Sequence, residues 1–165
     1  MSALEIQLKI YLDKGALLYC EAFRSFVSQM SCFSQLEQLS LSLVNRISFD
    51  RLKIEMFDFS NLSLLKELRL DLKSHTALNF VGSKNNPVMV TGFPKSLELL
   101  SLALVGNFNY SLEEVKDLPR LRIFHSNLYD HILHSNMLNP NVEQLGLRCM
   151  HRTLNLPATD KLQIL

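Results

Sequence analysis

The sequence predicts an α/β fold in which short parallel strands repeat along the chain and stack into a curved solenoid. Leucine accounts for 34 of the 165 residues, and the pattern L-x-x-L-x-L-x-L occurs three times without a mismatch. Within each copy the leucines alternate with other residues, which is typical of a strand that buries one face. Because one strand cannot bury its leucines alone, copies that recur along the chain must stack on one another.

Three complete copies of the pattern set the repeat length. They begin at Leu36, Leu65 and Leu97, and the two intervals between them are of nearly equal length. Weaker copies extend the series toward both ends of the chain. They consist of Leu118, Leu121 and Ile123; of Val142, Leu145 and Leu147; of Leu8, Ile10 and Leu12, aligned with Leu39, Leu41 and Leu43; and of Leu162 with Ile164. We therefore expect one domain, residues 1–165, of about six or seven irregular repeats.

The segments between the strands are expected to cover the convex side of the solenoid with short helices or extended segments. Residues 14–33 carry apolar side chains at helical spacing and predict an amphipathic helix. These side chains are Phe23, Phe26, Val27 and Met30. A second helix is predicted at Leu112–Leu118, because Ser111 and Glu114 have the spacing of a capping box and Pro119 follows.

Three further segments are predicted with less regular patterns. A third helix is expected at residues 129–137, ending before Asn139–Pro140. Apolar and other residues alternate along Arg51–Phe59, which predicts an extended segment on the convex side of the solenoid. Residues 83–87 follow a glycine and end in proline, which indicates a loop.

The repeated leucines resemble those of the leucine-rich repeat superfamily. The resemblance is strongest from Leu36 to Leu147, and the lead-in FPKSL at Phe93–Leu97 is most similar to irregular intracellular types, fungal and F-box-associated. The asparagines that follow the strands, Asn45, Asn107 and Asn127, lie one or two residues later than in the family consensus. The resemblance implies a parallel sheet on the concave face and recognition of other proteins without catalysis.

Composition and charge exclude several functional classes. Seventeen Lys and Arg against sixteen Asp and Glu leave a net charge of +1, which gives no general attraction to nucleic acid or to an anionic membrane. Met1–Tyr11 lacks the basic and apolar blocks of a signal peptide, and Leu97–Val105 is too short to span a membrane. Three cysteines without a C-x-x-C pair favour reduced thiols. We expect a cytoplasmic or nuclear protein that binds neither membrane nor nucleic acid.

Two reactive groupings are present in the sequence, and no further motif supports either one. His131 and His134 are three residues apart on the predicted third helix, with Cys149 and His151 downstream, which is one arrangement that zinc sites use. A catalytic Cys149 or His131 would also need an orienting acid and an oxyanion hole, and no pattern marks them. The sequence therefore predicts no enzyme, no metal and no cofactor.

Residues that alternate with the leucines are expected to project onto the concave face. They fall into three columns: Gln7, Gln38, Glu67, Leu99, Arg120, Gln144; Lys9, Ser40, Arg69, Ser101, Arg122, Gly146, Gln163; and Tyr11, Ser42, Asp71, Ala103, Phe124, Arg148. Arginine and aromatic residues are enriched at binding hot spots, and arginines gather around Phe124 toward the C-terminal end. The predicted partner-binding residues are Arg69, Asp71, Arg120, Arg122, Phe124 and Arg148. The expected partner is a protein with an acidic segment.

Alternative interpretations stay open at this level. One is the substrate-recognition arm of an F-box-type ubiquitin-ligase adaptor, with the F-box on another chain. The sequence begins and ends within predicted strands, at Ile6 and at Lys161–Leu165, and an uncovered terminal repeat exposes its leucines. A second alternative is therefore a truncated fragment of a longer repeat protein, or a chain that pairs end to end. A third is a solvated sheet face with no partner.

Overall fold

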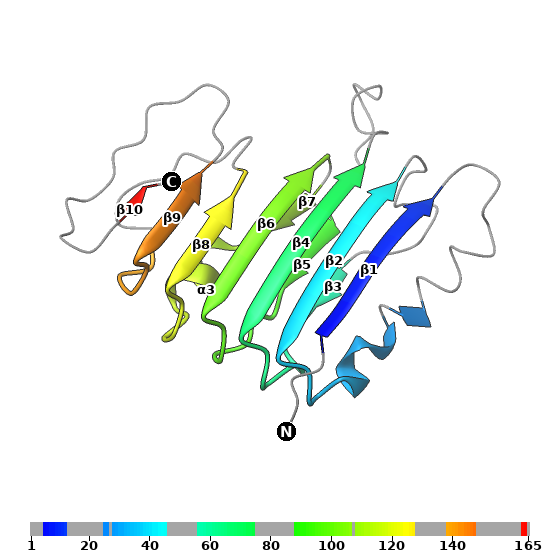
Figure 1. Ribbon diagram of the computed structural model, residues 1–165, viewed down its shortest axis with the longest axis horizontal. Helices are drawn as coiled ribbons and strands as arrows, with labels where there is room; N and C mark the ends of the chain where they lie inside the picture. Colours follow the sequence, from blue (N-terminus) through cyan, green and yellow to red (C-terminus); the bar gives the residue numbers. More distant parts are fainter. Residues whose placement is uncertain are drawn as a thin grey trace.

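The protein is described here by a computed structural model, which is of the α/β class with two parallel sheets and few helices. The structure describes residues 5–12, 25–26, 28–45, 56–74, 88–106, 108–127, 138–147 and 163–164. Figure 1 shows the larger sheet in front and the smaller sheet behind it.

The larger sheet contains seven parallel strands, in the order β1-β2-β4-β6-β8-β9-β10. The strands are β1 (Glu5–Leu12), β2 (Gln38–Asn45), β4 (Glu67–Ser74), β6 (Leu99–Val105), β8 (Ile123–Ser126), β9 (Gln144–Leu147) and β10 (Gln163–Ile164). Each repeat supplies one strand and the next repeat supplies its neighbour, as the repeated leucine pattern predicts. The parallel sheet is therefore confirmed.

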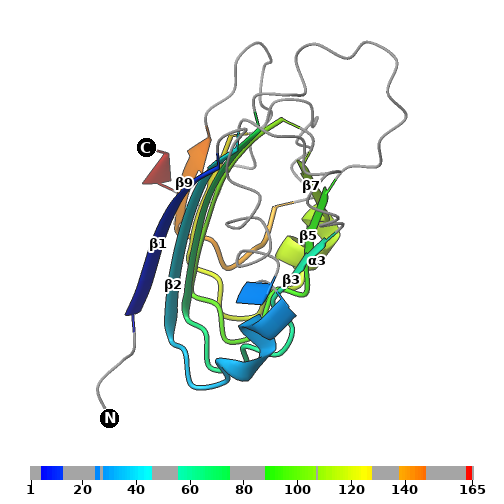
Figure 2. The same ribbon diagram turned by 90° about the vertical axis from the view of Figure 1, so that its right-hand side faces the viewer.

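A smaller sheet forms from the segments that link the strands of the larger one. Its three parallel strands are β3 (Met56–Asp58), β5 (Val88–Thr91) and β7 (Phe108–Tyr110), in that order. The extended segment predicted at Arg51–Phe59 is confirmed for 56–58, while its pairing into a sheet was not foreseen. Figure 2 shows the two sheets as separate layers, with α3 (Leu112–Lys116) in the layer of the smaller sheet.

The predicted helices are confirmed in part. Phe26 and its described neighbours are helical and lead into a short 3-10 helix, η1 (Met30–Cys32), in which Met30 is buried. In α3 the Ser111 hydroxyl accepts a hydrogen bond from the Glu114 amide over 3.3 Å, as a helix N-cap should. The predicted helix at 129–137 and the loop at 83–87 lie outside the described residues.

The capping box at Ser111 is only half formed. The Glu114 carboxylate accepts hydrogen bonds from the Thr91 hydroxyl at 2.7 Å and from the Gly92 amide at 3.0 Å. It therefore ties α3 to the end of β5, whereas the capping box predicts that it caps its own helix. Gly92 has a φ of +71°, a conformation that L side chains rarely adopt, so glycine suits this close approach.

The strand register corrects the predicted repeat at Leu118. Leu100 pairs with Phe124, and Phe124 in turn pairs with Leu145. The copy therefore begins at Leu121 and not at Leu118, and Phe124 occupies a leucine position with 2% of its surface exposed. The prediction that Phe124 lies on the concave face is wrong, because only aliphatic residues were expected at the repeated leucine positions.

The registers at both ends of the sheet also differ from the predicted ones. Leu8 pairs with Leu41, so the predicted alignment of Leu8 with Leu39 is wrong. At the other end, Gln163 pairs with Gln144, whereas the prediction aligned it with Gly146. Each correction shifts the strand by two positions. A shift of two preserves the alternation between faces, which explains why the sequence pattern could not detect it.

A repeated turn fixes where strands of the larger sheet begin. The amide of Leu36, of Leu65, of Leu97 and of Val142 donates to the carbonyl three residues earlier, over 2.9 to 3.2 Å. At the start of the strand, one carbonyl then accepts two successive amides from the following repeat. These carbonyls belong to Glu37, Lys66, Glu98 and Arg122. The recurrence of the same local geometry keeps the strands in register.

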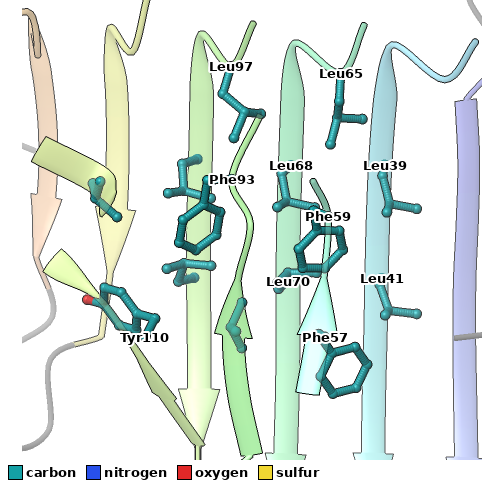
Figure 3. Packing of buried hydrophobic residues seen from close by; sticks show 14 of the residues in the cluster. Leu39, Leu41, Phe57, Phe59, Leu65, Leu68, Leu70, Phe93, Leu97 and Tyr110 are labelled. Carbon is teal, nitrogen blue, oxygen red and sulfur yellow. The ribbon is translucent and has the colours of Figure 1, made fainter. Parts of the chain in front are cut away.

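The hydrophobic core lies between the two sheets. Inward leucines of β2, β4 and β6 are buried, and Figure 3 shows Phe57, Phe59 and Phe93 from the linking segments lying over them. Burying a leucine or phenylalanine side chain stabilises the fold by roughly 1.5–3 kcal/mol. The aromatic residues of the linkers therefore complete a core that the leucines of one sheet cannot close.

One polar contact joins the layers inside this core. Ser126 occupies a leucine position on β8, and its hydroxyl lies 2.8 Å from the hydroxyl of Tyr110 on β7. Both side chains are buried, so the hydrogen bond compensates for the loss of water around the two groups. Burial raises the pKa of Tyr110 to about 12, although the hydrogen bond to Ser126 lowers it somewhat.

Replacement of Phe124 by alanine tests its position in the core. We expect Phe124→Ala to lower the free energy of unfolding by about 3–5 kcal/mol, because it leaves a cavity under β8. Its outward neighbour is the matched control, and Ile123→Ala should cost only about 1 kcal/mol. Urea unfolding followed by circular dichroism measures both. Equal losses for the two variants would contradict the register.

High pH tests the buried Tyr110. The unfolded tyrosine ionises near pH 10 while the folded one stays neutral to about pH 12, so rising pH favours the unfolded state. Each unit of pKa difference corresponds to about 1.4 kcal/mol of stability lost above pH 10. Between pH 10 and 12, Tyr110→Phe should therefore lose less stability than the wild type in urea unfolding. The same pH dependence in both proteins would refute the buried hydroxyl.

Candidate functional site

The candidate site lies on the face of the larger sheet that points away from the core, here called the outer face. Its residues follow the strand register in three rows. The rows are Gln38, Glu67, Leu99, Ile123, Gln144; Ser40, Arg69, Ser101, His125, Gly146; and Ser42, Asp71, Ala103. The predicted columns are confirmed on β2, β4, β6 and β9. On β8 they are wrong, since Ile123 and His125 take the places predicted for Arg120 and Arg122.

Strand β4 presents four charged side chains of alternating sign to the outer face. We call this set, Glu67, Arg69, Asp71 and Lys73, the β4 ridge. Within the ridge, Arg69 pairs with Glu67 at 3.3 Å and Lys73 pairs with Asp71 at 3.1 Å. These side chains are between 35% and 49% exposed. Arg69 and Asp71 therefore face outward as predicted, each beside a charge of opposite sign on its own strand.

Arg122 belongs to a second set of charges, in the row immediately before the strands. We call this set, Glu37, Lys66, Glu98, Arg122 and Glu143, the charge row. The Lys66 ammonium lies 2.7 Å from Glu37, and the Arg122 guanidinium lies 2.7 Å from Glu143. The hydrogen bond that Lys66 donates to Glu37 raises the pKa of Lys66, and the hydrogen bond that Arg122 donates to Glu143 likewise raises the pKa of Arg122. Neighbouring repeats thus carry opposite charges at the same position.

A shallow groove opens beside this row, between the turns that precede β8 and β9. We call it the Arg120 groove, and its volume is about 380 Å³. It is lined by Glu98, Pro119, Arg120, Arg122, Pro140, Asn141, Val142 and Glu143. Arg120 is exposed and makes no hydrogen bond or ion pair to the residues that the structure describes. Arg120 and Arg122 thus both line this groove, before β8 begins and not at the strand positions predicted for them around Phe124, whereas Arg148 lies outside the described residues.

Asn139 holds the groove in shape, although the sequence predicted only that a helix ends before it. Asn139 is buried, and its side-chain amide donates to the carbonyls of Val115 at 2.9 Å and Leu118 at 2.6 Å. Its side-chain oxygen accepts from the Asn141 amide at 2.8 Å. Val115 lies in the last turn of α3 and Leu118 lies two residues after the helix, so these bonds fasten the turn before β9 to the C-terminal end of α3. The signal in the sequence was the turn Asn139–Pro140–Asn141.

Two apolar side chains of the outer face lie next to the charge row. Leu99 and Ile123 are register partners, and each directly follows a charged residue of that row, Glu98 and Arg122. Leu99 is only 8% exposed although it points away from the core. Arginine is among the residue types that carry most binding energy at protein interfaces, and here it adjoins this apolar pair.

The described residues offer no catalytic or metal-binding constellation. No group of three or more His, Cys, Asp or Glu side chains among them could hold a metal ion. His125 rests against Gly146, where an added Cβ would come within 2.7 Å of the imidazole. The residues of the zinc hypothesis, His131, His134, Cys149 and His151, lie outside the described part of the chain. In that same part, no helix has the length and apolar character to span a membrane.

No protein-family model, curated protein or solved structure matches the chain. The functional inferences below therefore depend on the geometry and charge of the described residues.

Charge reversal at Glu98 tests the charge row. Glu98→Lys would place three cations side by side, at Lys66, residue 98 and Arg122. We expect a loss of stability of up to about 1 kcal/mol at low salt, because exposed charges interact weakly. The loss should vanish at about 1 M salt, where the Debye length is about 3 Å. Glu98→Gln is the control and should show a smaller salt-dependent loss; salt-independent losses would contradict the electrostatic origin.

Proposed function

We propose that the chain is a non-catalytic protein-recognition module that binds an acidic segment of a protein partner in the Arg120 groove. The observation that carries the proposal is the difference in bonding between the two arginines that line the groove. Arg120 is exposed and makes no bond within the described chain, while Arg122 is held by Glu143 at 2.7 Å. Arg120 is therefore the cation with hydrogen-bond donors still to satisfy.

The chemistry of the groove favours a carboxylate ligand. A guanidinium offers two parallel donors to one carboxylate, and such charge-assisted bonds are about twice as strong as neutral ones. Pro119 and Pro140 line the groove with fixed backbone, so little conformational freedom is lost when a partner binds. Glu98 and Glu143 lie in the same groove and would repel a uniformly acidic chain. We therefore expect the partner to place one acidic side chain at Arg120, with an apolar residue over Ile123.

We also infer that the parallel array is of the leucine-rich repeat type, with the outer face as its concave side. Support comes from the repeated turn before the strands and from the residue-by-residue register between repeats. A crystal structure of the chain tests this inference through the curvature of the larger sheet. A flat larger sheet would contradict it.

Substitution of Arg120 tests the proposed ligand. Peptides selected from a random library on the wild-type protein should contain an acidic residue next to apolar residues. Arg120→Glu should weaken their binding at least about tenfold, equivalent to about 1.4 kcal/mol, as measured by fluorescence anisotropy. Arg120→Lys should weaken it less, because lysine keeps the charge and loses the paired donors.

The matched control for this experiment is Lys116→Glu, an exposed charge reversal on α3. It should leave peptide affinity unchanged. Selected peptides without an acidic residue, or equal affinity for the wild type and Arg120→Glu, would overturn the proposal.

A further inference from the structure

We propose that the β4 ridge binds a second copy of this chain, face to face across a twofold axis. The signs along the ridge run negative, positive, negative, positive, from Glu67 to Lys73. When all four charges are paired, this order is complementary to itself only when it is read backwards. It therefore indicates an antiparallel partner with the same sequence.

The symmetry can be followed residue by residue. The twofold axis lies in the interface, perpendicular to β4 and level with the midpoint between Arg69 and Asp71. It turns the outer faces of the two copies toward each other and reverses the direction of β4 in the second copy. Glu67 of one copy then lies opposite Lys73 of the other, and Arg69 lies opposite Asp71. Because the axis repeats each contact, two kinds of pair give four attractive contacts, as expected for an isologous interface. A parallel arrangement would instead set like charges opposite one another.

The strands beside the ridge leave room for this approach. Level with Arg69 and Asp71, the outward positions hold Ser40 and Ser42 on β2 and Ser101 and Ala103 on β6. These four side chains are much smaller than those of the ridge, so the middle of the ridge projects beyond both of its flanks. Two ridges can therefore meet, and their long side chains can lean over the small flanking residues at the roughly 10 Å separation of stacked sheets.

The ion pairs within each ridge do not oppose the formation of ion pairs between the two copies. Each pair within the ridge is partly exposed to water, where an ion pair contributes little to stability. Between two sheets the same charges lose water and attract one another more strongly. Wrong registers would place like charges together, so the ridge also restricts how two copies can meet. The inference uses β4 and does not depend on the Arg120 groove, which lies at the starts of β8 and β9.

Two single charge reversals provide the test. Arg69→Asp puts like charges opposite one another twice, and so does Asp71→Arg. Sedimentation velocity at low salt should show a wild-type dimer, and each single variant should dissociate with a Kd at least about tenfold higher. An equimolar mixture of the two variants should form a heterodimer, because all four contacts become attractive again. The double variant Arg69→Asp/Asp71→Arg should recover the homodimer for the same reason.

Recovery in the mixture and in the double variant separates an interface effect from a folding defect. Lys116→Asp, on α3, is the control substitution and should dimerise as the wild type does. A wild-type chain that stays monomeric at low salt would refute the proposal, and so would single variants that still dimerise. Failure of the mixture to form a heterodimer would equally overturn it. Loss of dimer with intact peptide binding at Arg120, or the reverse, would distinguish this inference from the proposed function.

Discussion

The structure depends on the register between consecutive parallel strands. At the start of a strand, one carbonyl accepts two successive amides of the next repeat, at Glu37, Lys66, Glu98 and Arg122. This double acceptance fixes the alignment of each repeat on the preceding one, and the leucines then stack because their positions coincide. Linkers of different length are tolerated, because nothing in the register depends on how the chain travels between two strands.

The same register creates the surface as well as the core. Because the same turn recurs before these strands, the residue immediately before each strand lies at the same edge of the sheet. Its charge therefore lies beside the charges of the equivalent residues in the neighbouring repeats. Alternating signs in the charge row therefore add attraction between repeats that the backbone has already aligned. The β4 ridge arises differently, within one strand, because residues two apart share a face. The charge row cannot be recognised in the sequence without knowing which positions of different repeats are equivalent.

Linkers contribute more than connections between strands. Phe57, Phe59 and Phe93 close the core from the second layer, and Tyr110 satisfies the hydroxyl of Ser126, which stands at a leucine position. Asn139 performs a comparable task at the turn before β9, where its side-chain amide donates to the carbonyls of Val115 and Leu118 at the end of α3. Each case is a local departure from the leucine pattern that a specific long-range hydrogen bond or aromatic contact makes stable.

The sequence by itself determined the parallel sheet, the approximate place of each strand in the larger sheet and the outward direction of Arg69 and Asp71. Leucine periodicity suffices for this, because burial of one face is a local property of a strand. Only the tertiary structure decided the frame of the repeat at Phe124, the two-position shift of β1, the pairing of β5 with β3 and β7, and the role of Asn139. These features depend on partners that are distant in the sequence, and hydrophobic pattern carries no information about which distant group a residue meets. Phe124 illustrates this limit of the hydrophobic pattern, because a phenylalanine in the core and a phenylalanine on an exposed face are the same residue in the sequence.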